Sequence, residues 1–168
     1  MEQAEAELRR KAETIRQRLG EEYGEPAGVR DLDAVSELVS TILSQNTNDA
    51  NRDVAFNRLR QRFPTWQEVL EADPGAVVDA IRPAGLANQK APWIQQALRA
   101  IVAERGELDL EFLRDWPVAE AKAWLSSLQG VGPKTAAIVL LFALGRPAFP
   151  VDTHVHRVSG RLGLIGPR

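Results

Sequence analysis

The 168-residue sequence contains no cysteine. This absence excludes disulfides, thiolate zinc sites, cysteine nucleophiles and an iron–sulfur cluster held by cysteines of this chain. A large excess of charge of one sign is also absent, because 21 Lys and Arg residues face 23 Asp and Glu residues and the formal net charge is −2. Composition alone therefore gives no bulk electrostatic reason to bind nucleic acid or an anionic membrane, and any site for a polyanion must be local.

Long apolar runs are missing as well. No run approaches the ~20 residues that span a bilayer, and the first residues, Met1–Glu5, are acidic. The sequence therefore predicts neither a membrane helix nor a secretory signal peptide. We expect a cytoplasmic protein that has no membrane partner.

Apolar residues recur at helical spacing along most of the chain. One such series is Val35, Leu38, Val39, Ile42 and Leu43. No segment alternates with the period of two that a half-buried strand needs, and no fixed repeat is present. The sequence predicts an all-α fold, with residues 1–168 forming one helical domain.

Local signals divide this domain into short helices. Predicted starts are marked by Asp31 and Asp33, by Thr47-Asn48, by Thr65 with Glu68 in capping-box spacing, and by Pro74 and Pro117. Predicted stops are Phe63-Pro64, Arg105-Gly106 and Leu144-Gly145, and linker-like segments cover 24–29 and 146–150.

Charge is unevenly distributed along the chain. Residues 126–168 hold five basic residues and a single acid, Asp152, for a net charge of +4, so residues 1–125 carry −6. The C-terminal quarter could present a basic face to a phosphate backbone. A scattered set of solvated arginines explains the same numbers.

Residues 118–144 predict two helices joined by a tight hairpin. Gly130 and Gly132 permit positive φ and a close approach of a ligand to the backbone, and Pro133 sets the entry to the second helix. Amides at that helix N-terminus would point at a phosphate oxygen. An ordinary glycine cap between packed helices is the alternative explanation.

A second segment makes the pattern specific. The hairpin reads L-x-G-V-G-x-K-T-A over 128–136, and V-D-T-H-V-x-R-V follows over 151–158. Together they resemble the helix-hairpin-helix DNA glycosylases of the endonuclease III family. Segments 42–49 and 84–91 extend the similarity to about residues 30–165. The resemblance implies a two-lobed all-α fold with one six-helix barrel lobe, and base excision repair by flipping a damaged nucleotide out of the duplex.

Two residues could carry this chemistry. The Lys134 amine can attack the sugar C1′ and form a Schiff base if it is neutral at that moment. The carboxylate of Asp152 can stabilise positive charge that develops on the sugar. Asp152 could instead serve only as a helix N-cap.

The resemblance also implies residues that enter the duplex. Leu86 matches an apolar wedge, and Gln45 or Asn46 matches a polar side chain that fills the vacated space. A core contact is the alternative for Leu86.

His154 and His156 are two residues apart and make a poor metal site. The full set of expected DNA-binding residues is Gln129, Gly130, Val131, Gly132, Thr135, Gln45, Asn46, Leu86, Lys90, His154 and Arg157.

The chain departs from the family's longer members, which continue through further helices and four cysteines that hold a [4Fe–4S] cluster. This chain, with Arg168 as its last residue, is therefore expected to be either a fragment or a minimal version, without a cofactor. Lys134 favours a bifunctional glycosylase and abasic-site lyase that acts as a monomer on double-stranded DNA containing a damaged base or abasic site. There are two alternatives: a non-catalytic helix-hairpin-helix DNA-binding module and a helical protein-interaction domain. The sequence does not identify which damaged base is the substrate.

Overall fold

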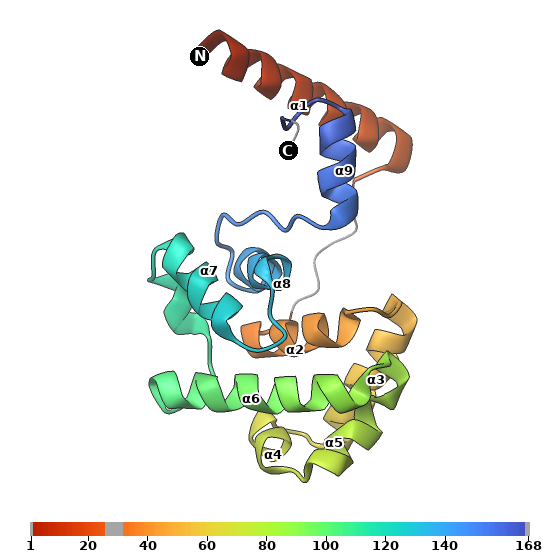
Figure 1. The fold of residues 1–168 in the computed structure, drawn as a ribbon, viewed down its shortest axis with the longest axis vertical. Helices are drawn as coiled ribbons and strands as arrows, with labels where there is room; N and C mark the ends of the chain where they lie inside the picture. The colour runs from red at the N-terminus through yellow and green to blue at the C-terminus, as the bar shows by residue number, and fades with distance from the viewer. Residues whose placement is uncertain (1, 26–31, 167–168) are drawn as a thin grey trace. The chain divides into compact units, whose positions relative to one another are not determined.

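The structure is a computed structural model that describes residues 2–25 and 32–166 (Figure 1). These two ranges contain helices and turns but no β-strand. The prediction of an all-α protein is confirmed.

The α-helices follow one another through short turns. They are α1 (Glu2–Tyr23), α2 (Ala34–Ser44), α3 (Asp49–Arg62), α4 (Trp66–Glu71), α5 (Pro74–Ile81), α6 (Ala87–Arg105), α7 (Val118–Ser127), α8 (Pro133–Ile138) and α9 (Thr153–Arg161). Two short 3₁₀ turns, η1 (Arg82–Ala84) and η2 (Glu111–Arg114), and a π-helical turn, η3 (Val139–Ala143), complete them.

The chain divides into two compact units. One unit comprises residues 31–150, and the other comprises the residues before and after it, with α1 and α9. The predicted linker-like segments 24–29 and 146–150 lie next to the two boundaries. The central unit carries the hydrophobic core, whereas α9 has no buried residue.

The core of the central unit forms around α2 and α6. Both helices bury apolar side chains, among them Leu38 and Ile42 on α2 and Ile94 and Leu98 on α6. Figure 1 shows α6 with α2 on one side and α4 and α5 on the other, in agreement with the contacts between these helices. The position of α6 lets it support several turns at once.

Most predicted helix starts carry their expected caps. Asp33 accepts a hydrogen bond from Ser36 N at 2.9 Å, and Thr65 with Glu68 forms both bonds of a capping box. Pro117 is the N-cap of α7 and precedes its first turn, so that predicted start is shifted by one residue. Asp31 lies outside the described residues. These caps depend on neighbours within three residues, which is why the sequence reveals them.

Candidate functional site

The predicted hairpin joins α7 to α8, and its two glycines differ. Gly130 has φ +80°, and a Cβ added there would collide with the indole ring of Trp93 on α6. Gly132 has φ −90° and ψ 176°, and a Cβ there would have no neighbour within 4 Å. Of the two glycines that permit positive φ, Gly130 therefore adopts it and Gly132 does not. The backbone at Gly132 is extended, and the space around it leaves room for a ligand.

The hairpin side chains divide into exposed and buried ones. Gln129 and Lys134 are exposed, whereas Val131 and Thr135 are only 4% and 6% exposed. The Val131 amide also donates to Leu128 O at 3.0 Å. The side chains of Val131 and Thr135 therefore pack in the core. That these two hairpin residues bind DNA stays a prediction, which concerns their backbone groups.

Lys134 is the second residue of a firmly anchored helix. The inner face of α8 and η3 buries Ala136, Ala137, Val139 and Leu140. The α-helix continues as a π turn, a feature that is frequent at functional sites. This packing fixes the helix that presents the exposed lysine.

Asp152 is the N-cap of α9, as the cap interpretation expects. Its Oδ1 accepts a 2.7 Å hydrogen bond from Val155 N. A half-buried carboxylate that holds a helix start can still present charge to a ligand, so the cap leaves a chemical role available. A pocket of about 290 Å³ adjoins it and is lined by Val151, Asp152, Thr153 and His156.

The two histidines of α9 have different surroundings. His156 lines the pocket with Asp152, whereas the exposed His154 has its Nδ1 3.1 Å from an Nη of Arg157. Of the two, the sequence predicts only His154 as a DNA-binding residue. The four-residue spacing from Asp152 to His156, which places both on one side of the helix start, is the signal that could have found His156.

No metal site accompanies these residues within 2–25 and 32–166, where no three His, Asp or Glu side chains gather closely enough to hold an ion. In the same part of the chain, no helix combines the length and apolar character needed to cross a membrane.

Leu86 occupies an unusual backbone conformation for a leucine. Its φ and ψ are 49° and 32°, in the left-handed region, and its side chain is 50% exposed. The preceding Gly85 also has positive φ. A core contact is therefore excluded for Leu86, and strain of this kind clusters at functional sites.

Gln45 and Asn46 are adjacent at the end of α2 but differ in exposure and in hydrogen bonding. Gln45 is half-buried, and its Nε2 donates to Gly130 O at 2.7 Å. Asn46 is exposed with φ +51°, a conformation that asparagine tolerates better than most residues. The geometry assigns Gln45 a link to the hairpin and leaves Asn46 at the surface.

Lys90 corrects the sequence interpretation. Its side chain is 0% exposed, and its Nζ donates to Leu43 O at 2.7 Å and Ala84 O at 2.8 Å. Burial lowers the pKa of this amine below its usual value. A side chain enclosed in this way cannot contact a DNA phosphate, so Lys90 is a structural residue of the central unit.

The basic C-terminal quarter is less uniform than its sequence suggests. Arg146 donates to Arg114 O and Trp116 O, which makes it an internal clamp, and Arg168 lies outside the described residues. Lys134, Arg157 and Arg161 are exposed.

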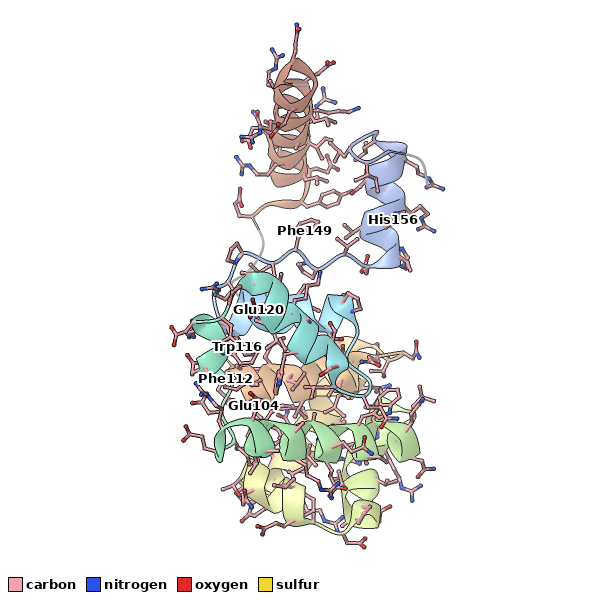
Figure 2. The ribbon with its side chains drawn as sticks, turned by 60° about the vertical axis from the view of Figure 1, so that its left-hand side comes forward. Glu104, Phe112, Trp116, Glu120, Phe149 and His156 are labelled. Atoms are coloured by element: carbon pink, nitrogen blue, oxygen red, sulfur yellow. The ribbon has the colours of Figure 1, made fainter. Side chains whose placement is uncertain are left out.

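An aromatic cluster lies beside α7. Phe112 packs edge-on against Trp116 and Trp124, and the Trp124 indole donates to Glu104. Figure 2 labels Phe112, Trp116 and Glu104 in this region. Glu107, Asp109, Glu111 and Asp115 line a pocket together with Phe112 and Arg105, and the Arg105 guanidinium lies over the Phe112 ring. Arg114 pairs with Glu111, so acidic and basic side chains are mixed around this cluster.

One further pocket lies away from the predicted residues. It has a volume of about 590 Å³, and Arg60, Trp66 and Asp109 are among its lining residues. Size alone does not make it the functional site, because none of the residues that carry the resemblance lines it.

Comparison with known proteins decides the family. A family model described as the HhH-GPD superfamily base excision DNA repair protein matches residues 39–168, which include the hairpin, Lys134 and Asp152. The chain belongs to this superfamily. Among HhH-GPD relatives is an Arabidopsis thaliana protein provisionally named a DNA glycosylase, to which this chain is 46% identical over 128 residues. The matched residues make up 76% of this chain and 44% of that protein. This chain is 38% identical over 143 residues to endonuclease III of Thermotoga maritima, covering 85% and 63% of the two chains.

Solved HhH-GPD structures show the same fold. An endonuclease III in a non-covalent complex with DNA superimposes with a TM-score of 0.75 at 28% identity, over 92% of this chain and 68% of that one. A trapped covalent endonuclease III–DNA intermediate gives 0.73 at 30% identity, over 90% and 68%. The chain spans about half to two thirds of the length of these relatives and structures.

Proposed function

We propose that this chain belongs to a base excision repair enzyme, a DNA glycosylase and abasic-site lyase that acts on double-stranded DNA containing a damaged base or abasic site. The observation that carries the proposal is Lys134, an exposed amine at the start of the anchored helix that follows the hairpin, within the segment matched by the family model. A module that only binds DNA through backbone amides has no need of this amine.

The proposed reaction assigns separate tasks to the two candidate residues. The neutral amine of Lys134 attacks C1′, the bond between C1′ and the base breaks, and the base leaves with a proton. Asp152 stabilises the positive charge on the sugar while this bond breaks. The adduct then opens its sugar ring: the C1′–O4′ bond breaks, O4′ takes a proton, and the C1′–N bond becomes the double bond of a Schiff base. This Schiff base allows loss of a C2′ proton and cleavage of the bond between C3′ and the 3′ phosphate oxygen, which nicks the strand.

The names of the relatives support this class of reaction. One relative of this chain is the DNA glycosylase/AP lyase ROS1 of Arabidopsis thaliana, 40% identical over 100 residues, which are 60% of this chain and 7% of that protein. The trapped covalent endonuclease III–DNA intermediate is a second point of support.

Borohydride trapping on an abasic-site duplex tests the proposal. The wild-type chain should form a covalent adduct, because reduction fixes only an amine condensed with C1′. Lys134→Gln should lose the adduct and keep DNA binding, since the proposed phosphate contacts are backbone groups. Lys122→Gln on α7, the preceding helix of the same hairpin, is the matched control and should trap as the wild type does.

The competing function is a non-catalytic hairpin module. A wild-type chain that binds the duplex without trapping or nicking would favour it. A Lys134→Gln protein that still traps would instead place the chemistry on another amine.

A further inference from the structure

The three turns that the proposed function directs toward DNA are connected inside the central unit. They are the turn at Gln45–Asn46, the turn at Gly85–Leu86 and the hairpin at Gly130–Gly132. Gln45 joins the first to the hairpin by its 2.7 Å bond to Gly130 O. Lys90 joins the first to the second through its two carbonyl acceptors.

Both carbonyls that accept hydrogen bonds from Lys90 lie at the C-terminal end of a helical segment. Leu43 O belongs to the last turn of α2, whose C-cap is Gln45, and Ala84 O belongs to the last residue of η1, whose C-cap is Gly85. Carbonyls in the last turn of a helix have no partner within that helix and attract a cation. One ammonium group therefore caps both segments immediately before the chain enters the two turns.

The same helix also supports the hairpin. Trp93 follows Lys90 by three residues on α6, which places both on one face of that helix. The Trp93 ring lies where a Cβ of Gly130 would be. One face of α6 is thus the common base of all three turns.

A buried lysine is an expensive way to fill a core. Taking an ammonium group out of water costs free energy even when it is hydrogen-bonded, and an apolar residue of similar volume would often serve stability equally well. Burial of this lysine is therefore consistent with a role besides stability.

We propose that Lys90 is a positioning residue that fixes the Gln45–Asn46 turn and the Gly85–Leu86 turn relative to each other, so that Leu86 and the polar residue that replaces the lost base enter a damaged duplex together. This inference rests on the proposed function. Lys90 itself does not touch DNA.

The matched control is on the same helix. Gln95 is 2% exposed, and its Nε2 donates to Val69 O at 3.0 Å and Ala72 O at 2.9 Å. It thus joins α6 to two backbone carbonyls, as Lys90 does, but toward α4 and away from the three turns. Lys90→Met and Gln95→Met each remove one such pair of bonds.

The experiment measures affinity by fluorescence anisotropy for a duplex with a stable reduced abasic analogue and for the same undamaged duplex. The ratio of the two affinities cancels any loss of folded protein. The wild type should prefer the abasic duplex. Lys90→Met should lower this ratio about tenfold, whereas Gln95→Met should leave it unchanged and lower only the melting temperature.

A double-mutant cycle tests whether Lys90 acts through Leu86. In the Leu86→Ala background, Lys90→Met should have little further effect on the ratio, whereas a general structural role would give additive losses. If Lys90→Met does not fold, Lys90→Gln replaces it, because an amide retains a donor and should lower the ratio by a smaller factor.

The outcomes separate the two proposals. A wild-type ratio near one overturns the proposed function and this inference with it. A high wild-type ratio that Lys90→Met or Lys90→Gln leaves intact overturns the positioning role alone, and so does an equal loss in Gln95→Met.

Discussion

The side-chain amide of Gln45 donates to the backbone carbonyl of Gly130 across 85 residues of sequence. Because that amide is occupied within the protein, the exposed Asn46 is the better candidate to fill the space left by a flipped base. The bond also makes the hairpin depend on the end of α2.

Exchanging the two residues separately distinguishes their tasks. Asn46→Gly keeps the positive φ and removes the side chain, so it should lower affinity for an abasic duplex about tenfold with the free energy of unfolding within about 1 kcal/mol of wild type. Gln45→Ala should lower stability by about 1 kcal/mol through the lost bond. Duplex binding and chemical denaturation measure both effects, and the reverse assignment of losses would return the role to Gln45.

The two hairpin glycines should respond differently to alanine. Gly130→Ala combines a left-handed backbone with a collision at Trp93 and should lower the free energy of unfolding by about 2–4 kcal/mol. Gly132→Ala should change it by less than about 0.5 kcal/mol, because the backbone is extended and the Cβ meets nothing. If phosphate approaches there, Gly132→Ala should still weaken binding to every duplex and reduce its salt dependence. Unchanged binding by a stable Gly132→Ala protein would exclude a close approach at this position.

Leu86→Gly should separate stability from function. A buried leucine would lose several kcal/mol on such truncation, but Leu86 is half exposed and strained, so the free energy of unfolding should change by less than about 1 kcal/mol. Turnover should fall more on a paired lesion than on a single-stranded one, because only the duplex requires unstacking. Equal losses on both substrates would argue against the wedge.

The sequence predicts those features whose interacting residues are close together in the chain. The capping box of Thr65 and Glu68 and the cap at Asp152 each involve a partner three residues away. Burial of Lys90 depends on carbonyls 47 and 6 residues distant. Nothing in the local pattern distinguishes such a lysine from one that faces phosphate.

The local sequence does not distinguish Gly130 from Gly132 either, because the residue that sets them apart is distant in the chain. Both fit a turn, but only the position of Trp93 on another helix shows which of them must be glycine for the fold. The sequence therefore predicts the hairpin, while the support beneath it emerges only from packing.

Burial of Lys90 predicts a pH effect on stability. Because its pKa is lowered in the folded chain, the unfolded chain binds more protons between that value and the ~10.4 of a free lysine. In this alkaline window the free energy of unfolding of the wild type should rise with pH relative to Lys90→Met. Below the window both states are protonated, so the difference between the two proteins should be constant. Denaturation at a series of pH values gives the free energy of unfolding against pH for the wild type and for Lys90→Met. The two curves would be parallel throughout if Lys90 were as well solvated in the folded chain as in the unfolded chain.

Substitutions at Asp152 should separate its role as a helix cap from a role in base release. Asparagine caps helices as well as aspartate, so Asp152→Asn should retain the bond to Val155 N and stay within about 0.5 kcal/mol of the wild type, whereas Asp152→Ala should cost about 1 kcal/mol. The neutral amide cannot stabilise a sugar cation, so Asp152→Asn should slow base release about a hundredfold while duplex binding persists.

Asp73 supplies the control, because its Oδ1 caps α5 by accepting from Ala76 N at 3.2 Å. Asp73→Asn makes the same chemical change at a helix start in the central unit and should leave base release unaltered. Single-turnover kinetics on a damaged duplex measure the rate. If Asp152→Asn released the base as fast as Asp73→Asn, the carboxylate of Asp152 would be a cap alone, and the charge on the sugar would have to be stabilised by another group.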